Sequence, residues 1–515
     1  MAEGVHTMNL HGIQGEASSY WIASSRQASY PELENDLTVD VAIIGGGFAG
    51  IISALFLKEA GLKVAILEGD RILKGVTGNT TAKITSLHRL VYHDLIKRFG
   101  REKAGQFAES NQAAIEKIDS LVKERKIDCG FSRLPFYTYA TGEEALRRIE
   151  DEVKAAQELG LPASFTGEIP LPVRVRGAVY FENQAQFHPC KFLVELASSI
   201  AGDGSHIFEK SRARHIEYGK ACNVITDSAS IKAEKVIIAT NFPVFDKQGM
   251  YFARLKPSRS YAVACDIKDP FPRGMFIDAE KEGYAWRGEN DNTQDLVIVS
   301  GSSHPAGHGG DHRENYRELE RAANAAYAEA LVKYSWSSQD NIPFDGAPYI
   351  GKATPFHNNV FVATGFSKWG MTLSVVAGMI LTDLIQGKKN SWIDIYNPLR
   401  FIPDGSSAKK LVSENVHVVK MFVKDHISGV PDISVLKEGD AQVVEDKGTK
   451  VAAFKDEQGN IYRLSPNCTH LGCVLSWNNA ERTWDCPCHG SRFKYSGEVI
   501  HGPAVKALRN IAEKE

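Results

Sequence analysis

VDVAIIGGGFAGIISALFLKEAGLKVAILEGD, at residues 39–70, is the stretch that decides the fold of the chain. An apolar, β-branched run at 39–44 breaks into three glycines, a helical pattern follows, and a second apolar run ends at Glu68. Short apolar runs bounded by glycine are typical of buried strands, and the segment between them has the periodicity of an apolar helix. The stretch therefore predicts a strand, a turn, a helix and a second strand, in that order.

The glycines of this turn have the spacing of a dinucleotide site. Gly45, Gly47 and Gly50 fit G-x-G-x-x-G: the first permits a tight turn, the second lets a pyrophosphate approach the backbone, and the third allows close helix packing. The helix that follows offers N–H donors to the phosphates. Glu68 is placed to accept hydrogen bonds from the ribose hydroxyls, and its charge disfavours a 2′-phosphate. The expected ligand is therefore FAD or NAD.

The next 320 or so residues continue with alternating helical and strand-like patterns, which indicate an α/β sheet. Residues 246–310 instead carry shorter β-like runs, and a long charged helix is expected after them at about 311–333. This change predicts a substrate-side sheet inserted into the nucleotide-binding fold. The other expected elements are helices at about 101–126, 143–159 and 190–200, a strand at 235–240, and a strand, glycine turn and apolar helix at 361–387.

Composition excludes several classes of protein. The 515 residues exceed the roughly 250–300 at which one hydrophobic core stops growing, so more than one domain is expected. A net charge of −3 gives no indication of a nucleic-acid partner. The most apolar stretch, 372–385, is shorter than the roughly 20 residues that span a bilayer and contains Asp383, so we expect no transmembrane segment. The first residues lack the pattern of a secretory signal, which predicts a cytoplasmic protein.

Four of the eight cysteines crowd together near the C-terminal end. Cys468 with His470, and Cys486 with His489, form Cys-x-His and Cys-x-x-His pairs whose leading cysteines are 18 residues apart. This pattern is typical of a Rieske [2Fe–2S] cluster, in which two thiolates hold one iron and two imidazoles hold the other. A zinc site, which can use the same ligand types, is the alternative. The four scattered cysteines are expected to be small buried side chains: Cys129, Cys190, Cys222 and Cys265.

From Val41 to about Gly387 the sequence resembles the D-amino-acid oxidase superfamily, particularly its glycine-oxidase-like and γ-glutamylputrescine-oxidase-like members. The resemblance depends on the order of several motifs: VAIIGGGFAGIISALFLKEAG, GVTGNTTAKITSLH, VIIATN, FDGAPYIG and FVATGFSKWGMTLS. It implies that the dinucleotide is FAD. No cysteine lies within 70–90, so non-covalent attachment is expected.

The resemblance also assigns further flavin contacts. In GVTGNTTAKIT, Gly78, Thr80 and Thr81 lie where the family wraps the pyrophosphate and flavin, and Lys83 could reach the ring or the substrate. In GFSKWGMTLS, a helix expected to begin near Met371 would direct its N-terminus at the flavin pyrimidine ring and stabilise negative charge there. The second flavin set is Gly365, Gly370, Met371 and Thr372.

The C-terminal boxes CTHLGC and CPCHGS, with HGPA at 501–504, resemble the Rieske proteins of cytochrome complexes. That resemblance implies a disulfide between Cys473 and Cys488, the two cysteines that remain. It also exposes a departure, because such proteins carry a serine and then a tyrosine two positions later, whereas this chain has Ser491 and Phe493. Losing that hydroxyl should lower the cluster potential.

The expected fold is an α/β FAD-binding Rossmann-type domain with an inserted antiparallel-sheet substrate domain of α+β type, followed by a small all-β Rieske domain. The FAD-dependent oxidoreductase domain spans 1–400, a linker 401–430, and the Rieske domain 431–515. Within the first domain the nucleotide-binding segments are about 36–98, 174–245 and 340–390, and the substrate segments about 99–173 and 246–339.

The expected reaction is oxidation of an amine or amino acid, with hydride passing to flavin N5 and an imine as product. Electrons would then pass singly to the [2Fe–2S] cluster and on to an external one-electron acceptor, a soluble carrier or a quinone. Two alternatives stay open: a non-enzymatic electron-transfer module, and an oxygen-using amine oxidase with a structural Rieske domain. Candidates for catalytic roles are Lys83, Tyr261 and Arg287, and Tyr284 and Trp286 could join them in lining the pocket.

Overall fold

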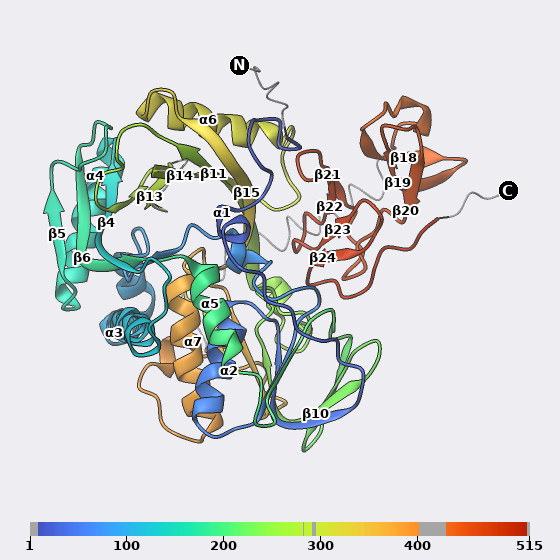
Figure 1. The fold of residues 1–515 in the computed structure, drawn as a ribbon, viewed down its shortest axis with the longest axis horizontal. Coiled ribbons are helices and arrows are strands. Elements are labelled where there is room, and N and C mark those ends of the chain that lie inside the picture. Colours follow the sequence, from blue (N-terminus) through green and yellow to red (C-terminus); the bar gives the residue numbers. More distant parts are fainter. Residues whose placement is uncertain (1–8, 282, 291–294, 401–428, 512–515) are drawn as a thin grey trace.

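The computed structural model describes residues 9–281, 283–290, 295–400 and 429–511. In that part of the chain, eight strands form a first sheet in the order β16-β17-β10-β1-β2-β7, with β9 paired to β10 and β8 to β9. Figure 1 labels β10 of this sheet. β1 runs parallel to both β2 and β10, and its last four residues are fully buried, as expected for a strand covered on both faces. The strands are β1 (Leu37–Ile44), β2 (Val64–Leu67), β7 (His206–Phe208), β8 (His215–Glu217), β9 (Cys222–Ile225), β10 (Ser230–Ile238), β16 (Tyr349–Lys352) and β17 (Val360–Thr364).

Two apolar helices pack against each other beside this sheet, α2 and α7. Their approach requires a glycine, because a Cβ at Gly378 would lie 2.5 Å from the Cγ2 atom of Ile52. The predicted end of α7 is confirmed: Gly387 follows the last turn in a left-handed conformation. The helices of the larger body are α1 (Tyr20–Ala23), α2 (Phe48–Glu59), α3 (Tyr92–Arg125, with a non-helical residue at Gly100), α4 (Glu143–Glu158), α5 (Pro189–Ser198), α6 (Arg313–Ala326), α7 (Gly370–Ile385) and α8 (Ile393–Tyr396).

The second sheet has nine strands within the described residues, in the order β15-β11-β14-β13-β12-β4-β6-β3, with β5 paired to β6. It is mixed, because β12 runs parallel to β4, so the expectation of an antiparallel sheet is wrong for that pair. Two of its strands, β3 and β6, lie in segments that we expected on the nucleotide-binding side, and the exact division of the chain stays a prediction. The strands are β3 (Lys83–Ile84), β4 (Ser132–Ala140), β5 (Ala163–Thr166), β6 (Gly177–Gln186), β11 (Leu255–Asp266), β12 (Met275–Asp278), β13 (Ala285–Asn290), β14 (Asp295–Pro305) and β15 (Leu331–Pro343).

The helix expected at about 311–333 is shorter than predicted, and this is a correction. α6 ends at Ala326, Tyr327 is extended, and the chain enters β15 at Leu331. The alanine-rich approach to Leu331 favours a helix locally, but β15 pairs along its whole length with β11, and this pairing fixes it as a strand.

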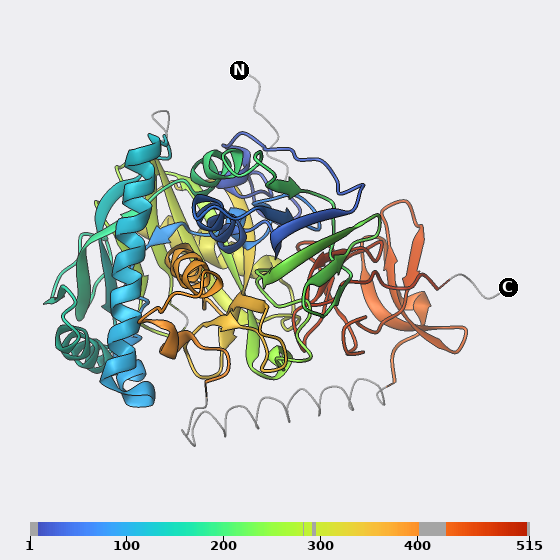
Figure 2. The same cartoon turned by 90° about the horizontal axis from the view of Figure 1, so that it is seen from below.

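The C-terminal residues form two small antiparallel sheets, as predicted for an all-β domain. Figures 1 and 2 both draw these strands against one side of the larger body. The expected linker at 401–430 lies almost entirely outside the described residues. Across the described ranges, no helix has the length and apolar character needed to cross a membrane. The strands are β18 (Ala441–Asp446), β19 (Thr449–Lys455), β20 (Ile461–Leu464), β21 (Ser476–Asn478), β22 (Thr483–Asp485), β23 (Arg492–Lys494) and β24 (Val499–His501).

Candidate functional site

The turn between β1 and α2 brings its backbone close to neighbouring chain. Gly45 has φ +112°, and a Cβ there would lie 2.6 Å from the carbonyl oxygen of Ala239. A Cβ at Gly50 would lie 1.9 Å from the carbonyl oxygen of Gly45, so no other residue fits where α2 begins. Gly47 precedes the first residue of α2. The turn therefore has the bare backbone that a pyrophosphate needs.

Glu68 lies beside this turn at the end of β2. Its carboxylate accepts a hydrogen bond from the backbone N–H of Gly46 at 2.8 Å and another from that of Asp70 at 3.0 Å. Burial raises the pKa of this carboxyl, and the two N–H donors and Arg212 oppose that shift. The two N–H donors fix the orientation of the carboxylate beside the glycine turn.

The segment after the turn contributes a hydroxyl that the sequence did not single out. Thr77 Oγ1 accepts a hydrogen bond from the backbone N–H of Phe48 at 2.9 Å and so holds the first residue of α2. Thr77 lines the cavity described below, whereas Gly78, Thr80 and Thr81 do not. Gly78 is a packing position, because a Cβ there would lie 2.4 Å from the carbonyl oxygen of Leu73. TGNTT contains three threonines, and the sequence alone could not show that the first of them, Thr77, would line the cavity.

The second predicted flavin set surrounds the start of α7. The helix begins at Gly370, one residue before the predicted start, and Gly370 and Met371 both face the cavity. Gly365 is left-handed at φ +77°, and a Cβ there would lie 2.6 Å from Pro343 Cγ. Thr372 is buried and exchanges hydrogen bonds with the backbone of Thr85, at 2.9 Å to its oxygen and 3.2 Å from its nitrogen. Thr372 therefore fixes the helix and does not line the cavity.

A cavity of about 640 Å³ is lined by residues from each of these segments: Gly45, Gly47, Glu68, Thr77, Gly370 and Met371. Its volume lies in the usual range for a cofactor site, about 300–1,000 Å³. One wall comes from the glycine turn and the first turn of α7, and another comes from β15, the strand whose first three residues lie within the expected helix at 311–333. A third part comes from the C-terminal domain. The cavity residues in β15 and in the C-terminal domain are Ser335, Trp336, Ser337, Ser338, Gln339, Asp340, Ala480, Glu481, Arg492, Ile500, His501, Gly502 and Val505.

The three residues suggested for catalysis lie outside this lining. Arg287 is fully buried, donates to the carbonyl oxygens of Ala82 and Phe187 at 2.9 and 3.3 Å, and pairs with Glu289. Its guanidinium is satisfied by protein groups, so the cavity does not receive it. Lys83 is also buried, and burial together with Arg287 lowers its pKa to about 7.

Tyr261 and the two other aromatic candidates are also held by protein partners. The hydroxyl of Tyr261 lies 2.9 Å from Nε2 of His304 and 3.0 Å from Nδ1 of His312. Tyr284 donates to Glu318, and Trp286 donates to the hydroxyl of Tyr139. These residues stabilise the second sheet and its contact with α6. The sequence could not exclude them, because a strand alternates its faces and either face could have met the ligand.

The four predicted cluster residues lie on two adjacent loops of the C-terminal domain. The rings of His470 and His489 are 5.1 Å apart between centroids, and the Nδ1 atom of each is buried and has no hydrogen-bond partner in the part of the chain that the structure describes. The hydrogen bond between the two thiols lowers the pKa of Cys468 and raises that of Cys486, and the N–H of His470 and the hydroxyl of Ser491 lower the pKa of Cys468 further. Two convergent thiols and two orphaned imidazole nitrogens fit a [2Fe–2S] cluster.

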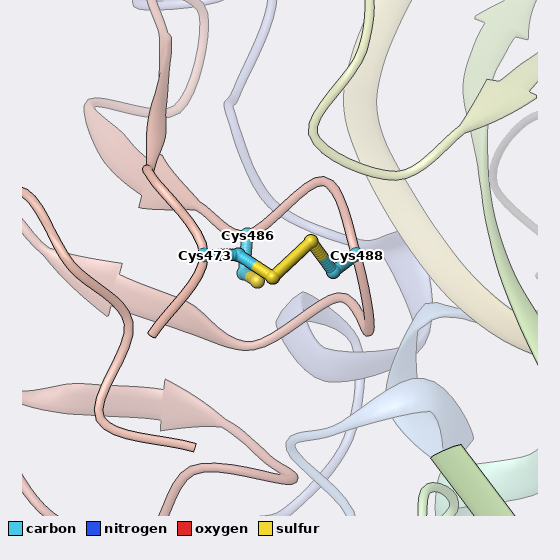
Figure 3. Close-up of side chains that lie close together, drawn as sticks. All are labelled: Cys473, Cys486 and Cys488. Carbon is cyan, nitrogen blue, oxygen red and sulfur yellow. A yellow bond between two sulfur atoms is a disulfide. The ribbon is translucent and has the colours of Figure 1, made fainter. Parts of the chain in front are cut away.

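The other two cysteines of this group form the predicted disulfide, Cys473–Cys488. Figure 3 shows this bond with the thiol of Cys486 beside it. Cys473, Cys486 and Cys488 come close enough to resemble a three-cysteine metal site, but the disulfide consumes two of the sulfurs. Only the thiol of Cys486 is then free among these three. The disulfide ties the loop after Cys468 to the loop after Cys486.

The cluster loops are packed directly on the larger body. Nε2 of His470 lies 3.1 Å from a carboxylate oxygen of Asp246, and both side chains are nearly inaccessible. Gln339 Nε2 donates to the carbonyl oxygen of Gly490 at 2.7 Å. A Cβ at Gly307 would lie 2.6 Å from the Cα of Pro487, so the backbones of the two domains nearly touch.

Buried charges cross the same interface. Arg259 of β11 lies 3.4 Å from Asp485 and 3.6 Å from Glu481, and Arg492 pairs with both of those carboxylates. The arginines hold the pKa of Glu481 and of Asp485 below the usual values. Two positive and two negative side chains therefore compensate one another across the domain boundary.

Comparison with known proteins supports the two kinds of site described above, one in the larger body and one in the C-terminal domain. Residues 40–384 match the family model described as FAD dependent oxidoreductase, and residues 428–512 match that of the Rieske [2Fe-2S] domain. A protein of Bacillus subtilis (strain 168), described as a putative Rieske 2Fe-2S iron-sulfur protein YhfW, is 37% identical over 98% of this chain and 99% of its own length.

Two more distant relatives match the larger body. A gamma-glutamylputrescine oxidoreductase of Escherichia coli (strain K12) is 22% identical, covering 72% of this chain and 89% of its own. The crystal structure of glycine oxidase from Geobacillus kaustophilus superposes with a TM-score of 0.61 at 20% identity, covering 71% of this chain and 100% of that one. The resemblance and the predicted cofactors, FAD and a [2Fe–2S] cluster, are confirmed. The chain belongs to the family of FAD-dependent oxidoreductases and carries a C-terminal Rieske [2Fe–2S] domain.

Proposed function

We propose that this protein oxidises an amine or amino acid at the cavity between its domains and passes the electrons singly through its Rieske cluster to an external acceptor. When bound, FAD accepts a hydride from the carbon next to the amine, leaving an imine for hydrolysis, and a [2Fe–2S] cluster carries one electron at a time. The acceptor is a one-electron carrier or a quinone. The rest of the proposal concerns what the residues of the chain do.

The FAD would be held by two helix N-termini. Gly45, Gly47 and Gly50 leave room for the pyrophosphate at α2, and Glu68 would accept hydrogen bonds from the ribose hydroxyls. The first turn of α7, at Gly370 and Met371, would direct N–H groups and the positive end of the helix dipole at the flavin ring. Thr77 joins this set from the cavity wall. The packing and hydrogen bonds of the other predicted residues support the shape of the site: Gly78, Thr80, Thr81, Gly365 and Thr372.

The cluster would be held by Cys468 and Cys486 through sulfur and by His470 and His489 through Nδ1. The orphaned Nδ1 atoms support this assignment, because a buried ring nitrogen without a partner costs stability unless an absent group binds it. The disulfide then joins the two ligand loops.

Asp340 is the cavity side chain best suited to hold the substrate amine. It lies on β15 in the cavity wall, and burial raises its pKa to about 6, with Lys368 opposing that shift. The carboxylate is therefore ionised at neutral pH, and an ammonium group would be its natural partner.

The single observation that carries the proposal is the position of β15. Alternate residues of this strand face opposite sides. Trp336 donates from Nε1 to the carbonyl oxygen of Asn79 on the flavin side, whereas Ser337 donates to Glu481 and Gln339 to Gly490 on the Rieske side. One strand therefore lines the flavin cavity and also contacts the cluster loop at Gly490, which supports electron transfer inside the chain.

An anaerobic screen of amines and amino acids tests this function. A substrate should bleach the flavin absorbance and then reduce the cluster, followed by its circular dichroism. Oxidation in air with stoichiometric peroxide and an oxidised cluster would instead identify an amine oxidase with a structural Rieske domain. A panel that bleaches nothing, in protein whose flavin photoreduces normally, would favour the non-enzymatic electron-transfer module.

A further inference from the structure

Residues 499–505 of the Rieske domain, here called the covering segment, form part of the wall of the dinucleotide cavity. Ile500, His501, Gly502 and Val505 line the same cavity as the glycine turn. The segment also approaches the larger body closely, because a Cβ at Gly502 would lie 3.0 Å from Val244 Cγ1. A Rieske domain that only received electrons would not need to enclose the flavin site.

The covering segment is fixed at both ends beside the ribose carboxylate. Arg212 donates to the carbonyl oxygen of Val499 at 3.2 Å, and Arg214 donates to that of Val505. Arg212 in turn lies against the residue after Glu68, since a Cβ at Gly69 would lie 2.9 Å from the guanidinium carbon. The covering segment therefore lies over the end of the cavity where Glu68 is placed to meet the adenosine ribose.

His501 presents an unsatisfied nitrogen at this end. Its Nε2 is buried and has no hydrogen-bond partner within the described residues, and His501 lines the cavity. Burial, with Arg492, Arg259 and Arg212 nearby, lowers the pKa of the ring to about 3, so the imidazole is neutral. A buried nitrogen of this kind is costly unless something in the cavity bonds to it.

We propose that the Rieske domain completes the FAD site, with the covering segment closing over the adenosine half and His501 Nε2 forming a hydrogen bond to the bound dinucleotide. The inference goes beyond the proposed function, because it concerns cofactor retention and holds whether or not electrons cross between the domains. It predicts that a residue of the iron–sulfur domain controls the affinity for FAD.

The test compares two amides in the full chain. A glutamine places its amide near the position of Nε2, whereas an asparagine reaches only the position of Nδ1. His501→Asn should therefore weaken FAD binding about 5- to 10-fold, the effect of one hydrogen bond, while His501→Gln stays close to the original affinity. Flavin-depleted protein is titrated with FAD by fluorescence, and with ADP as a probe of the adenosine half. Tyr495→Leu, on a half-exposed ring outside the cavity, is the control.

The cluster's circular dichroism confirms in each variant that the Rieske domain is folded. ADP affinity should fall with His501→Asn as FAD affinity does. Unchanged FAD affinity in His501→Asn, or equal weakening by His501→Gln and His501→Asn, would overturn the hydrogen bond to Nε2. Loss of FAD affinity without loss of ADP affinity would overturn its position over the adenosine half.

Discussion

Asp246 joins the two domains at the scale of a single side chain. It is 2% exposed by its side chain and lies 3.1 Å from Nε2 of His470, the ring nitrogen that points away from the proposed iron position. The ring of His489 packs against Phe242 and Phe252. The imidazole edges of the proposed cluster ligands are therefore covered by the flavin domain, and the external acceptor that we propose would have to approach another face.

We expect Asp246→Asn to raise the midpoint potential of the cluster. A carboxylate bonded to the ligand imidazole favours the oxidised cluster, which carries one more positive charge, and the amide lacks that charge. The rise in potential should not exceed about 130 mV, which for a one-electron couple corresponds to a charge-assisted hydrogen bond of roughly 3 kcal/mol. Redox titration with circular dichroism measures the shift, and Asp203→Asn, on an almost fully exposed carboxylate, is the control. An unchanged potential would mean that Asp246 only docks the domain.

A second change in the midpoint potential of the cluster is expected when Phe493 is replaced. It is fully buried among the cluster cysteines, whereas the ring of Tyr495 packs on Phe454 and Tyr462 and does not replace the missing hydroxyl. Phe493→Tyr should raise the cluster midpoint by tens of millivolts, below a ceiling of about 65–130 mV for one charge-assisted bond. The flavin potential should not move. If Phe493→Tyr does not raise the midpoint in a redox titration, the missing hydroxyl at this position does not lower the cluster potential.

Asp340 gives a pH-dependent prediction for the substrate. Its pKa is raised to about 6, so the carboxylate that attracts an ammonium group is present above that pH and lost below it. The kcat/KM of the wild type should fall as the pH drops through about 6. Asp340→Asn should raise KM roughly tenfold or more at neutral pH, because a charged hydrogen bond is lost, with a smaller effect on kcat. A wild-type acid limb that persists unchanged in Asp340→Asn would assign that limb to another group.

At the scale of elements, the sequence pattern correctly predicted the strands, helix and loops whose structure depends on residues close together in the chain. The strands and helix around Gly45 form as expected because the glycines fix the turn, and the Cys-His boxes come together because each loop carries its own ligands. The expected helix at 311–333 was extended over the first three residues of β15, because the pairing of this strand with β11 is not visible in a single sequence. The residues that β15 contributes to the cavity were missed because the sequence does not show which strand faces the ligand, and the contact of Asp246 was missed because it lies 224 positions from His470.

The two ligand loops should depend on the disulfide between them. Cys473 and Cys488 are 15 positions apart, and closing a loop of this size stabilises a folded domain by about 3 kcal/mol. Replacing both cysteines by serine should lower the thermal midpoint of the Rieske domain and make the cluster easier to lose on heating. Adding a thiol reductant should destabilise the wild type toward the variant and leave the variant unchanged. Equal thermal midpoints would show that packing alone holds the loops.

At the scale of the whole molecule, the domains share a wall, a buried charge network and a cavity. Arg259, Glu481, Asp485 and Arg492 compensate one another at the boundary, and β15 has one face toward each domain. Breaking such a buried pair is costly, so the structure favours a docked arrangement over a freely tethered one. The sequence indicated that the chain has two domains. It did not indicate that they dock, because docking depends on contacts between segments hundreds of residues apart.

Time-resolved photoreduction under anaerobic conditions tests the central claim most directly, because it needs no knowledge of the substrate. A light pulse with a sacrificial donor reduces the bound flavin, and flavin absorbance and cluster circular dichroism are then followed together. We predict that the cluster becomes reduced as the flavin is reoxidised, at a rate independent of protein concentration, as expected for transfer within one chain. A flavin that stays reduced beside an oxidised cluster, or a rate that grows with protein concentration, would contradict the account.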